Sequence, residues 1–184
     1  MARMGNHRSL LVGLLLGLSV SANGQNGQGQ LVADLAFCHL EVRETSENWS
    51  PEIKLMLADV CIHKPAYWCG GFAFRMHKLA KVVMPKPHCN FAWTPNWFPK
   101  DRIVWRANQS FDNIKIGDVI GLYYPRLGRI GHVEVVVGLE RPFVVTIGGN
   151  TNPAGGRSGQ GVHKHRRHID SIKYVGRWWT GPLK

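Results

Sequence analysis

The sequence predicts an α+β domain in which N-terminal helices pack on an antiparallel β-sheet formed by the rest of the chain. Two observations lead to this prediction. Apolar residues recur at helical spacing between Leu31 and Val83, and β-branched, apolar runs separated by turn residues follow from Lys115 onward. Helices first and strands second are typical of this fold class.

Three helices are expected in the first half of the chain. One covers residues 31–42, and a second covers residues 50–60, where Ser, Pro and Glu stand in the order of a helix start. The third begins at or just after Cys69, because apolar residues recur from there to Val83 at spacings of three and four. Prolines at positions 85 and 87 end it.

Strands are expected in the second half of the chain, where periodicity changes. The segments are IGDVIGLYY, GHVEVVVGL, FVVTIGG, GVHKH and KYVGRWW. Their short separations favour an antiparallel meander. The segment Asn90–Asn113, rich in aromatic residues and proline, is expected to be irregular.

Residues 1–22 have the composition of a secretory signal peptide. Basic side chains come first, an apolar run covers Leu10–Val20, and small residues end at Ala22. The apolar run is shorter than the roughly 20 residues that span a bilayer as a helix. We therefore expect cleavage after Ala22 and a secreted, periplasmic or cell-envelope location, with this segment as the sole contact with a membrane. The alternative is a membrane anchor that is later released.

The rest of the chain is expected to form one domain. Residues 23–30, NGQNGQGQ, are polar and Gly-rich and are expected to be a flexible leader. Residues 31–184 contain no internal repeat and no second linker, and their length suits one compact monomeric domain.

The charge indicates an anionic partner. The whole chain carries a net charge of +11, which falls to +9 when residues 1–22 are removed with their two arginines. A cell wall polymer, a membrane surface or a nucleic acid would satisfy this charge. We do not expect nucleic acid, because the sequence contains no recognised nucleic-acid-binding motif.

Four cysteines occur, at positions 38, 61, 69 and 89. An exported chain meets oxidising conditions, so disulfides are expected. If Cys69 is a working thiol, one pair forms at most among Cys38, Cys61 and Cys89, and all three pairings are open. No CxxC and no Cys/His spacing of a zinc site occurs, and the HKHRRH segment is interpreted as a solvated basic strand edge, so no metal or other cofactor is expected.

Cys69 is the candidate nucleophile. A helix N-terminus favours the thiolate, because partial positive charge points at the sulfur. Gly70 and Gly71 are expected to let a substrate approach the first turn, where the backbone N–H of Cys69 would hold an oxyanion. The alternative is a buried, inert cysteine.

His132 and Asn150 are the candidate partners of the thiol. His132 stands at the start of the most apolar predicted strand, and Asn150 ends the next strand after two glycines. A cysteine at a helix start followed by a histidine and an amide on adjacent strands is the papain-type order of catalytic parts.

Several segments, in order, resemble the CHAP family of cysteine- and histidine-dependent amidohydrolases and peptidases from bacterial cell walls and phage lysins. These segments are VRETSENWSPEIKLML, YWCGGFAF, IGDVIGLYY, GRIGHVEVVVG, TIGGNTN and GVHKHRRHIDSIKYVGRWW, which together span roughly residues 31–178. The resemblance implies a papain-like fold and hydrolysis of a peptidoglycan amide. It further implies Cys69 as nucleophile, His132 as general base and Asn150 as the residue that orients the imidazole.

The chain departs from the family pattern at two positions. Many relatives have an acid two residues before the asparagine, where this chain has Gly148. The histidine strand commonly continues His-Val-Gly, whereas here the third residue is Glu134. Residues i and i+2 share a strand face, so Glu134 competes with Asn150 for the imidazole. The alternative interpretation of Glu134 is a strand residue that faces solvent.

Asp118, Arg43 and Glu44 are interpreted as structural. Asp118 is expected to stabilise a turn, Arg43 and Glu44 to be structural first and substrate-contacting second, and Trp68, like Glu134, is a candidate accessory residue. The rival function is a non-enzymatic, basic secreted module that binds anionic wall polymers, in which Cys69 is structural.

Overall fold

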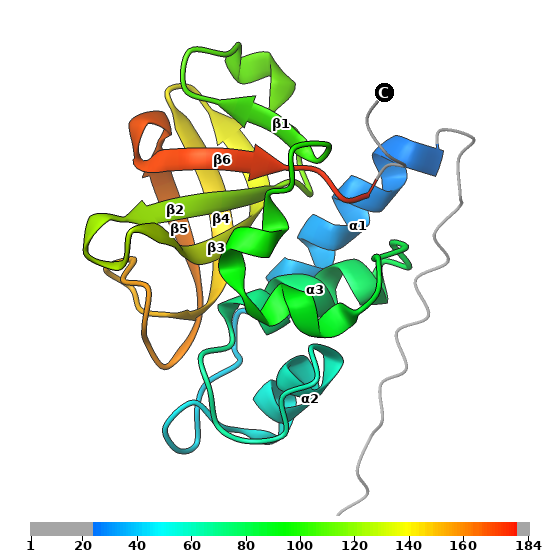
Figure 1. The fold of residues 1–184 in the computed structure, drawn as a ribbon, viewed down its shortest axis with the longest axis vertical. Coiled ribbons are helices and arrows are strands. Elements are labelled where there is room, and N and C mark those ends of the chain that lie inside the picture. The colour runs from blue at the N-terminus through cyan, green and yellow to red at the C-terminus, as the bar shows by residue number, and fades with distance from the viewer. Residues whose placement is uncertain (1–23, 180–184) are drawn as a thin grey trace, which may run out of the picture.

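The computed structural model describes residues 24–179, so the predicted signal segment lies outside the described residues. Three α-helices lie on one side of a six-stranded antiparallel sheet (Figure 1). The α+β class is therefore confirmed. None of the helices among residues 24–179 has the length and apolarity that crossing a membrane requires.

The first helix, α1, spans Gly24–Cys38 and corrects one expectation. Residues 24–30 are its first turns rather than a flexible leader. Close packing explains the difference, because a Cβ on Gly29 would lie 2.6 Å from the carbonyl oxygen of Ile116 and 2.9 Å from the ring of Trp179. Glycine-rich composition suggested disorder, but here a glycine allows the helix to meet the body of the protein.

Helices α2 and α3 form largely as predicted. Helix α2 spans Pro51–Asp59, and the Ser50 hydroxyl caps it by accepting a 3.2 Å hydrogen bond from the backbone of Ile53. Helix α3 spans Cys69–Leu79. It starts at the predicted residue but ends before Val83, because the backbone turns at Lys81, whose φ is +57°.

The sheet contains the predicted strands and one more. The strands are β1 (Ile103–Arg106), β2 (Val119–Tyr124), β3 (Arg129–Glu140), β4 (Phe143–Thr151), β5 (Gly161–His168) and β6 (Ile172–Gly176). Their order is β1-β6-β2-β3-β4-β5, so β2 to β5 form the expected meander while β6 returns to pair with β2. Strand β1 lies in the segment expected to be irregular, and it forms because Trp105 pairs with the distant Val175.

Short 3₁₀ helices complete the fold. They are η1 (His88–Ala92), η2 (Thr94–Trp97), η3 (Phe111–Asn113), η4 (Pro125–Leu127) and η5 (Ile169–Ser171). Helices η1 and η2 bring Phe91 and Trp97 into edge contact, with ring centroids 5.0 Å apart, and both rings also contact Trp178. These aromatic contacts order a segment that lacks longer regular structure.

The core divides along the two faces of the sheet. Val133, Val135 and Val137 of β3 belong to the large cluster that includes the buried side chains of all three helices. Val136 belongs to a smaller cluster formed by residues of η3 and the strands. Because successive strand residues point to opposite faces, His132 and Glu134 alternate with the residues of the large cluster.

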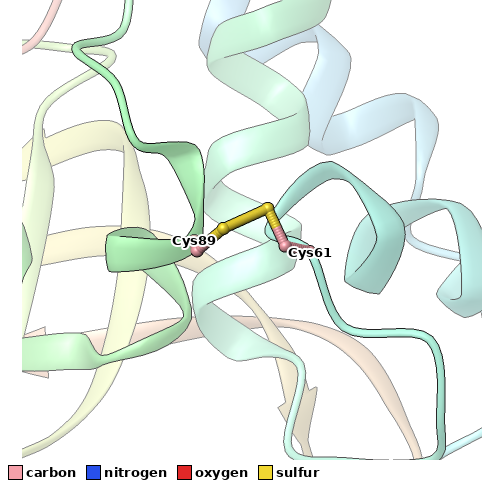
Figure 2. Close-up of a disulfide and its surroundings, with 2 residues drawn as sticks. All are labelled: Cys61 and Cys89. Carbon is pink, nitrogen blue, oxygen red and sulfur yellow. A yellow bond between two sulfur atoms is a disulfide. The ribbon is translucent and has the colours of Figure 1, made fainter.

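A disulfide joins Cys61, just after α2, to Cys89 in η1, with Cα atoms 5.1 Å apart (Figure 2). Cys38 is free and exposed, and Cys69 is free and buried. This pairing settles which of the three open combinations forms. It also leaves the candidate nucleophile as a thiol.

We expect the double variant Cys61→Ser/Cys89→Ser to lose about 3–4 kcal/mol of unfolding free energy, because the bridge closes a segment with a sequence separation of 28 residues. Urea unfolding without reductant measures the loss. The matched control is Cys38→Ser, which removes an exposed, free thiol and is expected to change stability by less than about 0.5 kcal/mol. Equal stability of the double variant and the control would contradict the prediction.

Candidate active site

Contacts of Trp68 and Asn150 fix the start of α3. Trp68 is the N-cap residue, is fully buried, and makes no side-chain cap to the helix. Its indole N–H donates to Glu44 at 2.9 Å, and its backbone N–H donates to the side-chain oxygen of Asn150 at 3.3 Å. Because no side chain caps α3, its first-turn N–H groups, including that of Cys69, remain suited to an oxyanion.

Gly70 and Gly71 serve packing rather than substrate approach, which corrects the sequence interpretation. Both are buried. A Cβ on Gly70 would lie 2.4 Å from the carbonyl oxygen of Phe91, and a Cβ on Gly71 would lie 2.7 Å from that of Met56. These two glycines let α3 contact the backbones of η1 and α2.

The thiol of Cys69 interacts with the imidazole of His132. Burial acts to raise the pKa of the thiol, but the charge of His132 and its hydrogen bond act the other way, as do hydrogen bonds from the backbone at Val133 and Gly70. The net result is a thiol pKa below its usual value. The expected encounter of Cys69 and His132 is therefore present in the structure, with the thiolate favoured.

His132 lies between the thiol and a carboxylate. Its Nε2 is 3.2 Å from Oε1 of Glu134, and both side chains are fully buried. Neither ring nitrogen has an ideally aligned hydrogen-bond partner, so the contacts are chiefly electrostatic. Burial acts to lower the pKa of His132, but Cys69 and Glu134 outweigh it and raise the pKa to about 9. The imidazolium is thus the favoured form at neutral pH.

Glu134 is held by a second cation and a hydroxyl. Arg167 donates to both carboxylate oxygens, from Nε at 3.0 Å and from Nη2 at 2.5 Å, and Thr146 donates at 2.5 Å. Burial acts to raise the pKa of Glu134, but His132 and Arg167 hold it far below its usual range. Glu134 is fully buried, so the alternative of a solvent-facing residue is wrong.

Gly148 makes the space that Glu134 occupies. It lies on β4, which pairs with β3, and a Cβ at this position would be 2.7 Å from Cγ of Glu134. A Cβ under 3.0 Å from another atom forces a shift of one of them. The glycine at position 148 is therefore required by the carboxylate at position 134.

The amide of Asn150 is engaged away from the imidazole. Its Nδ2 donates to Asn48 at 3.1 Å and to the carbonyl oxygen of Gly159 at 3.0 Å, while its Oδ1 accepts from Trp68. These bonds tie the end of β4 to the start of α3 and to the loop after α1. Within residues 24–179 the structure brings Glu134, and not Asn150, next to His132.

Arg167 was missed by the sequence analysis. The segment 163–168 was interpreted as a solvated edge, yet His165 is buried, with Nε2 3.9 Å from Glu134, and Arg167 is bound to that carboxylate. Residues 163, 165 and 167 alternate along β5 and share a face. This alternation in the sequence was the available signal that the three side chains lie together, and in the structure His165 and Arg167 of this face contact Glu134.

The positions interpreted as structural keep that role in the structure. Asp118 is buried and accepts hydrogen bonds from Lys115, Arg177 and Trp179. Glu44 accepts from Trp68 and from the backbone of Asn48. Arg43 donates to three backbone carbonyl oxygens, at positions 40, 42 and 162.

Comparisons with protein-family models, with curated proteins and with solved structures found no match. Among residues 24–179, no group of three or more His, Cys, Asp or Glu side chains is placed to hold a metal ion. The groups that the structure brings together are Cys69, His132 and Glu134. Together with Arg167 these form a buried row of alternating charges, which suits a thiolate nucleophile beside a proton donor.

We expect Glu134→Gln to lower the pKa of the His132 imidazole. Without the carboxylate the imidazolium is less stable, so the His132 pKa falls from about 9. The pH at which the thiolate of Cys69 loses its imidazolium partner therefore moves down by about one to three pH units.

The measurement is the chemical shift of the His132 ring protons against pH by NMR, in a Cys38→Ser background that removes the exposed free thiol. Asn150→Ala is the comparison variant, and a far-UV spectrum checks the fold. An unchanged profile in Glu134→Gln together with a shifted one in Asn150→Ala would make Asn150 the orienting residue.

Proposed function

We propose that this protein is an exported cysteine hydrolase that cleaves amide bonds in bacterial peptidoglycan. The observation that carries the chemistry is the thiol of Cys69 at a helix start, beside the imidazole of His132, which a buried carboxylate supports. The three parts come from α3 and β3, so rigid elements position them.

The reaction proceeds through an acyl-enzyme. The thiolate of Cys69 attacks the amide carbonyl carbon, and first-turn backbone N–H groups stabilise the oxyanion. As the C–N bond breaks, the imidazolium of His132 transfers its proton to the leaving amine. Neutral His132 then removes a proton from water, which attacks the thioester and releases the acid and the thiol.

Glu134 has the orienting role in this proposal, in place of Asn150. It contacts Nε2 of His132, which leaves Nδ1 as the ring nitrogen for the thiol. A carboxylate at this position fixes the ring and stabilises the imidazolium formed in each cycle. Asn150 contributes by holding Trp68 and hence the start of α3.

Peptidoglycan as the substrate and the papain-like assignment both rest on the CHAP resemblance. A thiol on the first turn of α3, a histidine on β3 and helices on one sheet face agree with that assignment. The bond is a sugar–peptide amide or a peptide bond of the stem or cross-bridge. The signal-like residues 1–22 and the basic charge support action at an envelope with anionic polymers.

The rival function is a basic secreted module that binds wall polymers without catalysis. The net charge favours such binding, but it gives no reason for a row of buried charges around a thiol. Burying charges costs free energy even when they are paired, so a module that only binds has no use for this arrangement.

We expect Cys69→Ala to abolish release of soluble products from purified peptidoglycan, because the acyl-enzyme cannot form. Turbidity loss and mass analysis of the products measure activity, and the products identify the bond. Cys38→Ala is the matched control, since it removes the exposed free thiol and is expected to keep parental activity. Parental activity in a folded Cys69→Ala variant would refute the assignment as a thiol hydrolase.

We also expect binding to insoluble wall material to weaken as salt rises. The net charge of +9 that remains without residues 1–22 is the cause, and exposed charges are screened within about 8 Å at physiological ionic strength. Sedimentation of Cys69→Ala with wall material across a salt series measures binding without turnover. Constant binding up to high salt would mean that contacts other than charge hold the complex.

A further inference from the structure

Arg157 is held between two tyrosine rings. It belongs to the loop between β4 and β5, and its guanidinium carbon lies 5.3 Å from the ring centroid of Tyr67 and 5.9 Å from that of Tyr124. Arg157 is partly buried. Attraction between the cation and the ring faces fixes where the guanidinium lies.

Both tyrosines belong to the surroundings of the candidate active site. Tyr67 directly precedes Trp68, the N-cap residue of α3, and Tyr124 ends the strand in which Leu122 pairs with His132. Burial, the charge of Glu134 and the charge of Cys69 all raise the pKa of the Tyr124 phenol, whereas Arg167 and Arg157 lower it. Tyr124, on which Arg157 stacks, is therefore within electrostatic range of the reacting groups.

This guanidinium has no anionic partner in the described part of the chain. Arg157 donates no hydrogen bond and forms no ion pair with any of residues 24–179. Arg167 is bound to Glu134, and Arg129, which also stacks on an aromatic ring, donates to Thr94 and to Ile130. Arg157 therefore presents a positioned set of donors that a planar anion would satisfy.

One hollow is lined by this arginine, and a second is lined by its neighbours Tyr67 and Ser158. One, of about 580 Å³, is lined by Arg157, Tyr124, Leu127, Pro125 and Arg126, which include two cations and no acid. The other, of about 610 Å³, is lined by Tyr67 and by the loop that carries Glu44 and Glu47. An anionic group is repelled by the carboxylates of the second hollow, so it belongs in the first.

The first hollow adjoins the strand of the candidate base. Tyr124 and Leu127 pack over Gly131, where a Cβ would lie 2.8 Å from one side chain and 2.9 Å from the other. Gly131 immediately precedes His132. The wall of this hollow therefore lies one residue along β3 from the imidazole.

We propose that Arg157, positioned by Tyr67 and Tyr124, binds a carboxylate of the substrate peptide next to the bond that is cut, which makes the enzyme selective for acidic peptides. This inference rests on the proposed function. The guanidinium donates two parallel hydrogen bonds to the carboxylate, and the apolar wall formed by Pro125 and Leu127 excludes water from the pair.

The test compares one muropeptide that the enzyme cleaves with the same muropeptide after its carboxylates are converted to primary amides. We expect the parent enzyme to lose about 10- to 100-fold in kcat/KM on the amidated form, since hydrogen bonds to charged groups carry this weight. Arg157→Met is expected to lose a similar factor on the native form and to treat the two forms nearly alike.

The matched control is Arg106→Met, which also removes an arginine that stacks on a tyrosine, Tyr174, but lies on β1 at the far edge of the sheet. We expect it to keep the parental preference. The alkylation rate of Cys69 in Arg157→Met, expected to equal that of the parent, separates substrate recognition from damage to the thiol site.

The outcomes separate this inference from the proposed function. If the parent enzyme cleaves no muropeptide and no intact peptidoglycan, the proposed function is overturned and this inference with it. Equal hydrolysis of both forms by the parent would overturn this inference alone. So would an Arg157→Met variant that loses activity but keeps the parental preference, because the arginine would then act on structure and not on the carboxylate.

Discussion

The buried carboxylate of Glu134 is the constraint around which the site is arranged. A fully buried carboxylate is costly unless cations and hydrogen bonds compensate it, and here Arg167, Thr146 and His132 do so. These partners come from β3, β4 and β5, so one side chain sets the relation among three strands. The same charge raises the pKa of His132, which in turn lowers that of the Cys69 thiol. The reactivity of the thiol thus depends on a residue it does not touch.

The residues at positions 134 and 148 form one feature in three dimensions. The CHAP pattern that the sequence resembles commonly has a glycine at the position of Glu134 and an acid at the position of Gly148. The two positions face each other on paired strands, and Gly148 has no room for a Cβ because Glu134 fills the space. The carboxylate on β3 and the glycine on β4 thus fit each other, and together they place an acid beside the imidazole of His132.

Sequence reasoning found the parts with local signals. Helix α2 carries its own cap at Ser50, and α3 begins at the cysteine that its periodicity indicated. Sequence reasoning failed for elements that form only through contacts between residues far apart in the sequence. Strand β1 depends on pairing with β6, and the start of α1 depends on Gly29 meeting Trp179, neither of which has a local pattern. Arg167 was missed because the residues around it in the sequence are basic, which predicted a solvent-exposed segment. In the structure its side chain is bound to the carboxylate of Glu134.

The thiol of Cys69 lies on a helix, whereas the imidazole of His132 lies on the sheet. Their contact therefore depends on how the helices pack against the sheet. His132 and Glu134 are fixed by the sheet, whereas Cys69 is fixed by the buried N-cap residue Trp68 and by glycine contacts of α3 with η1 and α2. Asn150 joins the two supports, because it ends β4 and accepts from the backbone of Trp68. The amide of Asn150 therefore acts on the position of the Cys69 thiol, and the carboxylate of Glu134 acts on the charge of the His132 imidazole. An amide in this place holds the helix start without adding a charge that would disturb the neighbouring ion pair.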